Sequence, residues 1–212
     1  MTAHAGRRVA GLSCLAAGVL PLIAVANPAL FDVWAADPAQ ALAIEAAHHG
    51  AWLFTTWLLA AGFGASVPAV VTIAGLLEGV IVRVATAVHL IGAGLLTVTT
   101  VFGVTVRADL LGAPIPDWYL PISRWLDGLD TTALGLLWPL AQLLLGLIVV
   151  RTRAVPVWAG WVLVAAGVVV LAQLAAFGGV IPAPMFIAWV VLGVATLAGA
   201  RPARRPAHQT TP

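Results

Sequence analysis

The stretch Asp37–Glu78, DPAQALAIEAAHHGAWLFTTWLLAAGFGASVPAVVTIAGLLE, decides the fold class of this chain. It begins with the pattern of a capped helix, because Asp37 is a preferred N-cap residue and a proline follows at the first helical position. From Gly50 to Leu77 the chain then carries no ionisable side chain over 28 residues. About 20 apolar residues are enough to cross the hydrocarbon core of a bilayer. The stretch therefore predicts a membrane-spanning helix with a polar extension at one end.

The composition of the whole chain also indicates a membrane protein. Of its 212 residues, 62% are hydrophobic and only 8% are charged, and the mean hydropathy is +1.05. Soluble domains are about one quarter charged. A net charge of +2 is too small to indicate nucleic-acid binding, and the single cysteine, Cys14, excludes an intrachain disulfide. We expect the lipid bilayer to be the main partner and expect no nucleic acid.

The hydropathy pattern predicts an all-α, polytopic transmembrane bundle that forms a single domain over residues 1–200. Six spans are expected, at about residues 9–31, 50–77, 80–106, 131–150, 157–177 and 185–200. Segments 32–49 and 107–130 are expected at the outer membrane surface. The second should form a short helix at headgroup level, because its charged residues alternate with tryptophan and tyrosine. Residues 201–212 are polar and proline-rich, which predicts a disordered cytoplasmic tail.

Two processing alternatives stay open for the first 26 residues. The Arg7–Arg8 pair, the apolar run and the small residues Ala24-Val25-Ala26 resemble a secretory signal cleaved after Ala26. Cys14, preceded by leucine and serine, resembles a lipoprotein site, although only five residues separate it from Arg8. We expect a retained helix instead, because the run is long enough to span the membrane.

The arginines predict the orientation of the six spans. Positively charged residues concentrate in cytoplasmic loops. With the amino terminus inside, eight of the ten arginines fall on the cytoplasmic side: Arg7, Arg8, Arg83, Arg151, Arg153, Arg201, Arg204 and Arg205. Arg107 and Arg124 fall outside. Both termini are therefore expected in the cytoplasm.

Glu45, His48 and His49 form the first candidate site. A carboxylate three and four positions before two imidazoles lies on one side of a helical turn, and Glu-x-x-His is the unit of carboxylate-bridged di-metal sites in bundles. The alternatives are a pH-sensitive external contact or a hydrated helix end without a specific role. A metal site would need further ligands and would rely on aspartates such as Asp32, Asp109 or Asp127. We expect neither a metal nor a cofactor.

His89 forms the second candidate site, because an ionisable side chain within a span is costly and is often functional. Gln142, Gln173, Thr86 or the Glu78 and Arg83 pair could be its partners. The alternative is a neutral histidine that hydrogen-bonds to a neighbouring helix. His89 is roughly 27 Å from the outer end of its helix at 1.5 Å per residue. It therefore cannot share a centre with His48 or His49.

One resemblance accompanies these patterns. The stretch AAHHGAWLFTTWLLAAGFGASVPAVVTIAGLLEG, followed by ATAVHLIGAGLLTV, resembles small, uncharacterised six-helix integral membrane proteins common in high-GC bacteria. It covers about residues 40–105. The resemblance implies a multi-pass protein of the bacterial cytoplasmic membrane and implies no activity or site residue.

Three functions are compatible with the sequence. The first is a non-enzymatic membrane component that packs with itself or with a partner protein. Its basis is the four-residue spacing of small residues in the second span, in the pairs Gly62/Ser66, Ala61/Ala65 and Ala60/Gly64. The second is a small-solute or proton-linked carrier that uses His89 and a helix break at Pro68. The third is a membrane enzyme or metal site at Glu45, His48 and His49. The non-enzymatic role is favoured because of these small-residue faces and because the spans contain few ionisable residues. The sequence also contains no phosphate-binding loop, zinc-binding cysteine pair or nucleophile elbow.

Overall fold

The computed structural model of the protein describes residues 3–199, whose regular secondary structure is entirely helical. Six helices are long: α1 (Ala3–Val25), α3 (His49–Ala74), α4 (Val80–Phe102), α6 (Trp138–Thr152), α7 (Val157–Phe177) and α8 (Ala183–Ala198). The shorter elements are the 3-10 helix η1 (Pro28–Ala35), the helices α2 (Pro38–Ala47) and α5 (Tyr119–Asp130), and the π-helical turns η2 (Gly103–Arg107) and η3 (Thr131–Leu137). Residues 200–212, which include the tail predicted to be disordered, lie outside the described range.

Five helical stretches are long and apolar enough to cross a membrane. They are Ala5–Val25, His49–Ala74, Val80–Arg107, Tyr119–Thr152 and Val157–Phe177. Helix α8 is also apolar but is shorter, at 16 residues. Large apolar side chains such as Leu12, Phe54 and Ile91 are exposed on the outer surface of the bundle, as expected where lipid surrounds a protein. The structure therefore indicates a membrane-embedded protein.

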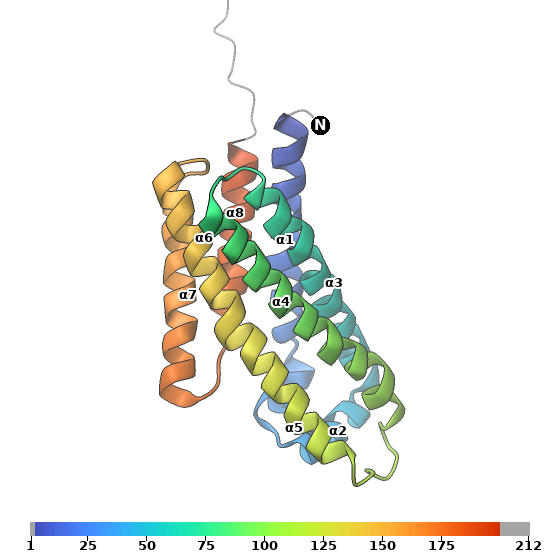
Figure 1. Ribbon diagram of the computed structural model, residues 1–212. Helices are drawn as coiled ribbons and strands as arrows, with labels where there is room; N and C mark the ends of the chain where they lie inside the picture. The colour runs from blue at the N-terminus through green and yellow to red at the C-terminus, as the bar shows by residue number, and fades with distance from the viewer. Residues whose placement is uncertain (1–2, 200–212) are drawn as a thin grey trace, which may run out of the picture.

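The six long helices form a closed ring. Each packs against two neighbours, in the order α1, α3, α4, α6, α7, α8 and back to α1. Figure 1 shows these helices side by side, with α2 and α5 together at one end. We call this the α2/α5 end. The opposite end carries the start of α1, the α3–α4 turn and the α6–α7 turn (Figure 1).

Glycines set the closest approaches within the ring. A Cβ added to Gly146 of α6 would lie 2.6 Å from the carbonyl oxygen of Gly160 in α7. A Cβ on Gly193 of α8 would lie 2.8 Å from the carbonyl oxygen of Gly11 in α1. Both distances are too short for a side chain, so these helix pairs meet through their backbones. Small residues allow this kind of packing in membranes.

The Gly62/Ser66 face of α3 also packs against other helices of the same chain. A Cβ on Gly62 would lie 2.5 Å from the ring of Pro21 in α1, whereas Gly64 faces open space. Ser66 is fully buried against α4, where its hydroxyl lies 3.0 Å from His89 Nε2. The small residues that predicted packing with another protein thus pack, on this face, against α1 and α4 of the same chain.

The first helix ends earlier than the expected boundary at residue 31. The side chain of Asn27 accepts a hydrogen bond from the backbone of Ala29 at 3.2 Å and caps the 3-10 helix η1. Pro28 explains the break, because the residue before a proline is disfavoured in the α conformation.

The segment 119–130 differs from the separate headgroup-level helix that the sequence predicts. Helix α5 continues through η3 into α6, so that Tyr119–Thr152 is one helical stretch of 34 residues. The π-helical turn η3 ends just before Pro139. A proline lacks an N–H and its ring excludes the carbonyl four residues earlier, which a local π-turn accommodates. One face of α5, with Ser123, Leu126, Asp127 and Asp130, lines a cavity, whereas Arg124 and Trp125 are exposed.

Candidate functional site

A cavity of about 730 Å³ lies at the α2/α5 end of the ring. Residues from η1, α2, α3, α4, η2, α5, η3 and the start of α8 line it. Small-molecule sites in proteins typically have volumes of about 300–1,000 Å³ and mostly apolar walls with a few polar groups. The apolar wall includes Trp34, Trp52, Leu59, Phe63, Leu96, Phe102, Leu134 and Phe186. The cavity therefore has the size and lining of a binding site.

A bidentate ion pair joins two walls of this cavity. Arg107 Nε donates to Glu45 Oε2 at 2.7 Å, and Arg107 Nη2 donates to Glu45 Oε1 at 2.6 Å. The Glu45 side chain is fully buried and that of Arg107 is 17% exposed. Burial raises the pKa of Glu45, and the guanidinium of Arg107 offsets part of this rise. The guanidinium also lies over the ring of Trp52, 5.1 Å from its centroid, in cation–π geometry.

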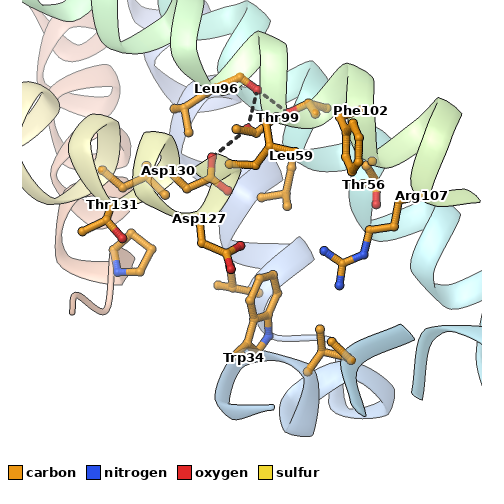
Figure 2. Close-up of a pocket in the computed structure, with 18 of the residues that line it drawn as sticks. Trp34, Thr56, Leu59, Leu96, Thr99, Phe102, Arg107, Asp127, Asp130 and Thr131 are labelled. Carbon is orange, nitrogen blue, oxygen red and sulfur yellow. Dashed lines mark hydrogen bonds between the residues drawn. The ribbon is translucent and has the colours of Figure 1, made fainter. Parts of the chain in front are cut away.

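Two aspartates project into the cavity from the opposite wall. Asp127 and Asp130 are three residues apart on α5 and therefore share one face of the helix. Asp130 Oδ1 accepts a hydrogen bond from Thr99 Oγ1 at 2.6 Å. Figure 2 shows both carboxylates, Arg107 and Trp34 around the same space. The acidic residues are thus part of the cavity wall and not only of the outer surface.

Both π-helical turns border the cavity. Gly103 and Arg107 of η2 line it, as do Thr131 and Leu134 of η3. A π-turn holds more residues per turn than an α-helix, so it changes the side from which the following side chains project, and such turns are frequent at functional sites. The position of Arg107 opposite Glu45 depends on the turn η2.

An aromatic cluster closes the cavity toward the centre of the ring. Phe63, which lines the cavity, meets Trp138 edge to face with ring centroids 5.5 Å apart. Trp138 in turn stacks on His89 at 4.6 Å, and its Nε1 donates to the His89 carbonyl at 3.1 Å. Trp189 contacts His89 edge to face at 5.4 Å. His89 is fully buried behind this cluster and does not line the cavity.

The side chains expected as partners of His89 make no hydrogen bond to it within the described residues, and Thr86 donates to the carbonyl of Val82 at 2.8 Å. Gln142 is buried and its Nε2 donates to the carbonyl of Met185 at 3.1 Å. Gln173 accepts from the backbone of Ile181 at 2.9 Å. Glu78, in the α3–α4 turn, and Arg83, near the start of α4, are exposed, and this turn lies at the end opposite α2 and α5 (Figure 1). Within residues 3–199, Glu45 and Arg107 form the one salt bridge, so Glu78 and Arg83 are not joined there.

The structure separates Glu45 from the two histidines of the first candidate site. His48 and His49 are exposed at the junction of α2 and α3, whereas Glu45 is buried against Arg107. Across residues 3–199, no group of three histidine, cysteine, aspartate or glutamate side chains is placed to hold a metal ion.

The sequence interpretation missed Arg107, Asp130 and Thr99 as site residues, and it considered Asp127 only as a possible metal ligand. Arg107 and the two aspartates are expected on the outer surface from their charge alone. Two signals point to them nonetheless: the i, i+3 spacing of the aspartates, and an arginine at the end of a span where few other arginines occur.

Comparisons of this chain with protein-family models, with curated proteins and with solved structures found no match. The fold and the cavity therefore define only a class: a helical, membrane-embedded protein with a charged cavity at one end of its helix ring.

Proposed function

We propose that the protein has six spans, including α8, with both termini in the cytoplasm and the cavity open to the outside. Helix α8 completes the ring between α7 and α1, which supports its assignment as a span. Arg7, Arg83, Arg151 and Arg153 lie at the end opposite the cavity, as expected for a cytoplasmic face. The resemblance to small membrane proteins of high-GC bacteria supports a bacterial cytoplasmic membrane.

Cysteine labelling in intact cells tests this orientation. We expect Asp117→Cys, in the exposed loop before α5, to react with a membrane-impermeant maleimide added outside. Glu78→Cys, at the opposite end, should react only after the cells are opened. The native Cys14 is fully buried and provides the background. Labelling of Glu78→Cys and not Asp117→Cys in intact cells would reverse the orientation.

We propose further that the protein is a non-enzymatic membrane component that binds a small molecule in its outward cavity. The observation that carries this proposal is the cavity itself, in which charged side chains lie within mostly apolar walls. Ionisable groups among membrane-embedded helices are costly and are retained mainly at functional sites. A receptor and a carrier share this binding step, and a carrier would also need the aromatic cluster at Phe63 and Trp138 to open.

The other candidate functions have weaker support. Packing with a second copy or a partner protein was motivated partly by the Gly62/Ser66 face, which α1 and α4 cover. A carrier that depends on His89 would need the bundle to open there, because His89 is fully buried and does not line the cavity described above. A metal site at Glu45, His48 and His49 would require the Glu45–Arg107 pair to separate.

A cavity-filling variant tests the binding proposal. Thr100 lines the cavity, whereas Thr97, on the same helix, is exposed and does not line it. Each hydroxyl donates only to the backbone of its own helix, at 2.6 Å for Thr100 and 2.8 Å for Thr97. Thr100→Phe and Thr97→Phe therefore remove the same kind of contact, and only Thr100→Phe fills the cavity. A ligand at 100 times its Kd stabilises a protein by about 2.7 kcal/mol.

A thermal-shift screen of metabolite-sized amines, acids and neutral compounds should therefore find ligands that raise the Tm. We expect these ligands to stabilise the wild type and Thr97→Phe, but not Thr100→Phe. If every stabilising compound acts equally on Thr100→Phe, or if no compound stabilises the wild type, the cavity is not a binding site.

A further inference from the structure

We propose that the cavity takes an organic cation, with an amine head near Asp127 and Asp130 and an apolar body along the aromatic wall. This inference rests on the proposed binding function and names its ligand class. Three features of the cavity support a cationic ligand: its charge, its hydrogen-bonding groups and its aromatic lining.

The first feature is an excess of negative charge. Of the described residues that line the cavity, Arg107 alone is basic, whereas Glu45, Asp127 and Asp130 are acidic. Arg107 is engaged by both oxygens of Glu45, so these two charges compensate each other. With Asp127 and Asp130 ionised, the cavity carries two uncompensated negative charges. An anionic ligand would be repelled there, and a cation would be attracted.

The second feature is an excess of hydrogen-bond acceptors at the aspartates. Within residues 3–199, Asp130 receives one hydrogen bond, from Thr99, and the Asp127 side chain receives none. The Thr99 hydroxyl has a single proton, yet it has two acceptors in reach, Asp130 Oδ1 at 2.6 Å and the Leu96 carbonyl at 3.0 Å. Carboxylates accept several hydrogen bonds, and an ammonium group donates up to three without accepting any. An amine head therefore supplies the donors that this wall lacks.

The third feature is the aromatic wall beside these carboxylates. Trp34 and Asp127 project into the same space in Figure 2. The residue Trp34 is 51% exposed, whereas one face of the Trp52 ring is already covered by Arg107. A cation within about 6 Å of an indole face gains cation–π stabilisation. Phe63, Phe102 and Phe186 extend the lining with apolar surface for the rest of the ligand.

A buried hydrogen-bond donor, the indole N–H of Trp52, adds a requirement for the ligand. Trp52 lines the cavity and is 8% exposed, and its Nε1 has no hydrogen-bond partner within the described chain. A buried N–H without a partner costs about 1–3 kcal/mol. A ligand with an oxygen acceptor on its apolar body would satisfy this donor.

Three matched probes test the ligand class by isothermal titration calorimetry on the purified, full-length protein. They are 4-phenylbutylamine, 4-phenyl-1-butanol and 5-phenylpentanoate, which differ in the charge of the head group and share a phenyl ring with four methylene groups. We expect the amine to bind about tenfold more tightly than the alcohol, which corresponds to about 1.4 kcal/mol, and the carboxylate to bind most weakly. The double variant Asp127→Asn with Asp130→Asn should lose this preference for the amine and keep the affinity for the alcohol. Asp109→Asn, at the same end but exposed and outside the cavity, is the matched control.

The possible outcomes separate the ligand class from the binding function. Equal affinities for the three probes, or an amine preference that survives the double variant, would overturn the cationic ligand. Binding of the alcohol that disappears in Thr100→Phe would in that case still support the cavity as a binding site. If Thr100→Phe leaves all three affinities unchanged, the probes bind elsewhere and both proposals are overturned.

Discussion

Replacing Arg107 by methionine is expected to destabilise the folded protein by about 3 kcal/mol at pH 8, because it leaves the Glu45 carboxylate buried without a partner. The bidentate contacts at 2.6 and 2.7 Å place this pair between α2 and η2. Removing one partner of a buried pair is more costly than removing both. The double variant Glu45→Gln with Arg107→Met should therefore regain most of the stability. Unfolding in detergent, followed by tryptophan fluorescence, measures these differences.

The loss of folding stability in Arg107→Met should increase with pH. Burial raises the pKa of Glu45, and Arg107 works against this rise, so without Arg107 the pKa rises further. A carboxyl group whose folded pKa lies above its unfolded value lowers stability as the pH increases through that interval. The variant should thus be less destabilised at pH 5 than at pH 8.

The exposed Arg124 supplies the control for this prediction. Arg124→Met should change stability by less than about 0.5 kcal/mol at either pH, because a substitution at an exposed position removes no buried contact. Two results would contradict the role assigned to the ion pair. One is an equal loss of folding stability in Arg124→Met and Arg107→Met, and the other is a loss of stability in Arg107→Met that is larger at pH 5 than at pH 8.

Replacing Trp138 by alanine is expected to cost about 3–5 kcal/mol, the range for removing a large aromatic side chain from a core. Trp138 is fully buried, stacks on His89 and meets Phe63 edge to face. Its Nε1 also donates to the His89 carbonyl at 3.1 Å. Trp138→Phe keeps much of the packing and should cost less than Trp138→Ala, although the hydrogen bond, worth about 1 kcal/mol, is lost. Chemical unfolding of the purified variants measures both values.

Trp158 provides the matched comparison, because it is 53% exposed on α7. Trp158→Ala should lose far less stability than Trp138→Ala. Equal losses at the two positions would show that Trp138 is not part of a packed core. The burial of His89 could then not be attributed to packing against Trp138.

Local features of the sequence determined the helices themselves. Asp37 caps α2 as predicted, with its Oδ1 accepting from the backbone of Ala39 and Gln40, both at 2.9 Å. Helix α7 begins at Val157 and ends at Phe177, the boundaries expected from hydropathy. Both results have a local cause. A cap needs only the next few residues, and a long apolar run in lipid must satisfy its backbone hydrogen bonds within its own helix.

The candidate site depended on contacts that no local pattern contains. The sequence drew attention to Glu45 but grouped it with His48 and His49, which are its neighbours in the chain. Its partner in the structure is Arg107, 62 residues away. Asp127 belongs to a segment that was expected at the membrane surface, whereas in the structure this segment continues into α6 and Asp127 lines the cavity.

The sequence by itself therefore determined that this chain forms long apolar helices and where most of them begin and end. The tertiary structure alone decided which polar side chains meet. Hydropathy acts on one helix at a time, whereas the order and rotation of helices in the ring follow from contacts between distant residues. The backbone contact between Gly146 and Gly160 and the packing of Gly62 on Pro21 are examples. Those contacts turn Glu45 toward Arg107 in the cavity wall and leave His89 enclosed by Trp138 and Trp189.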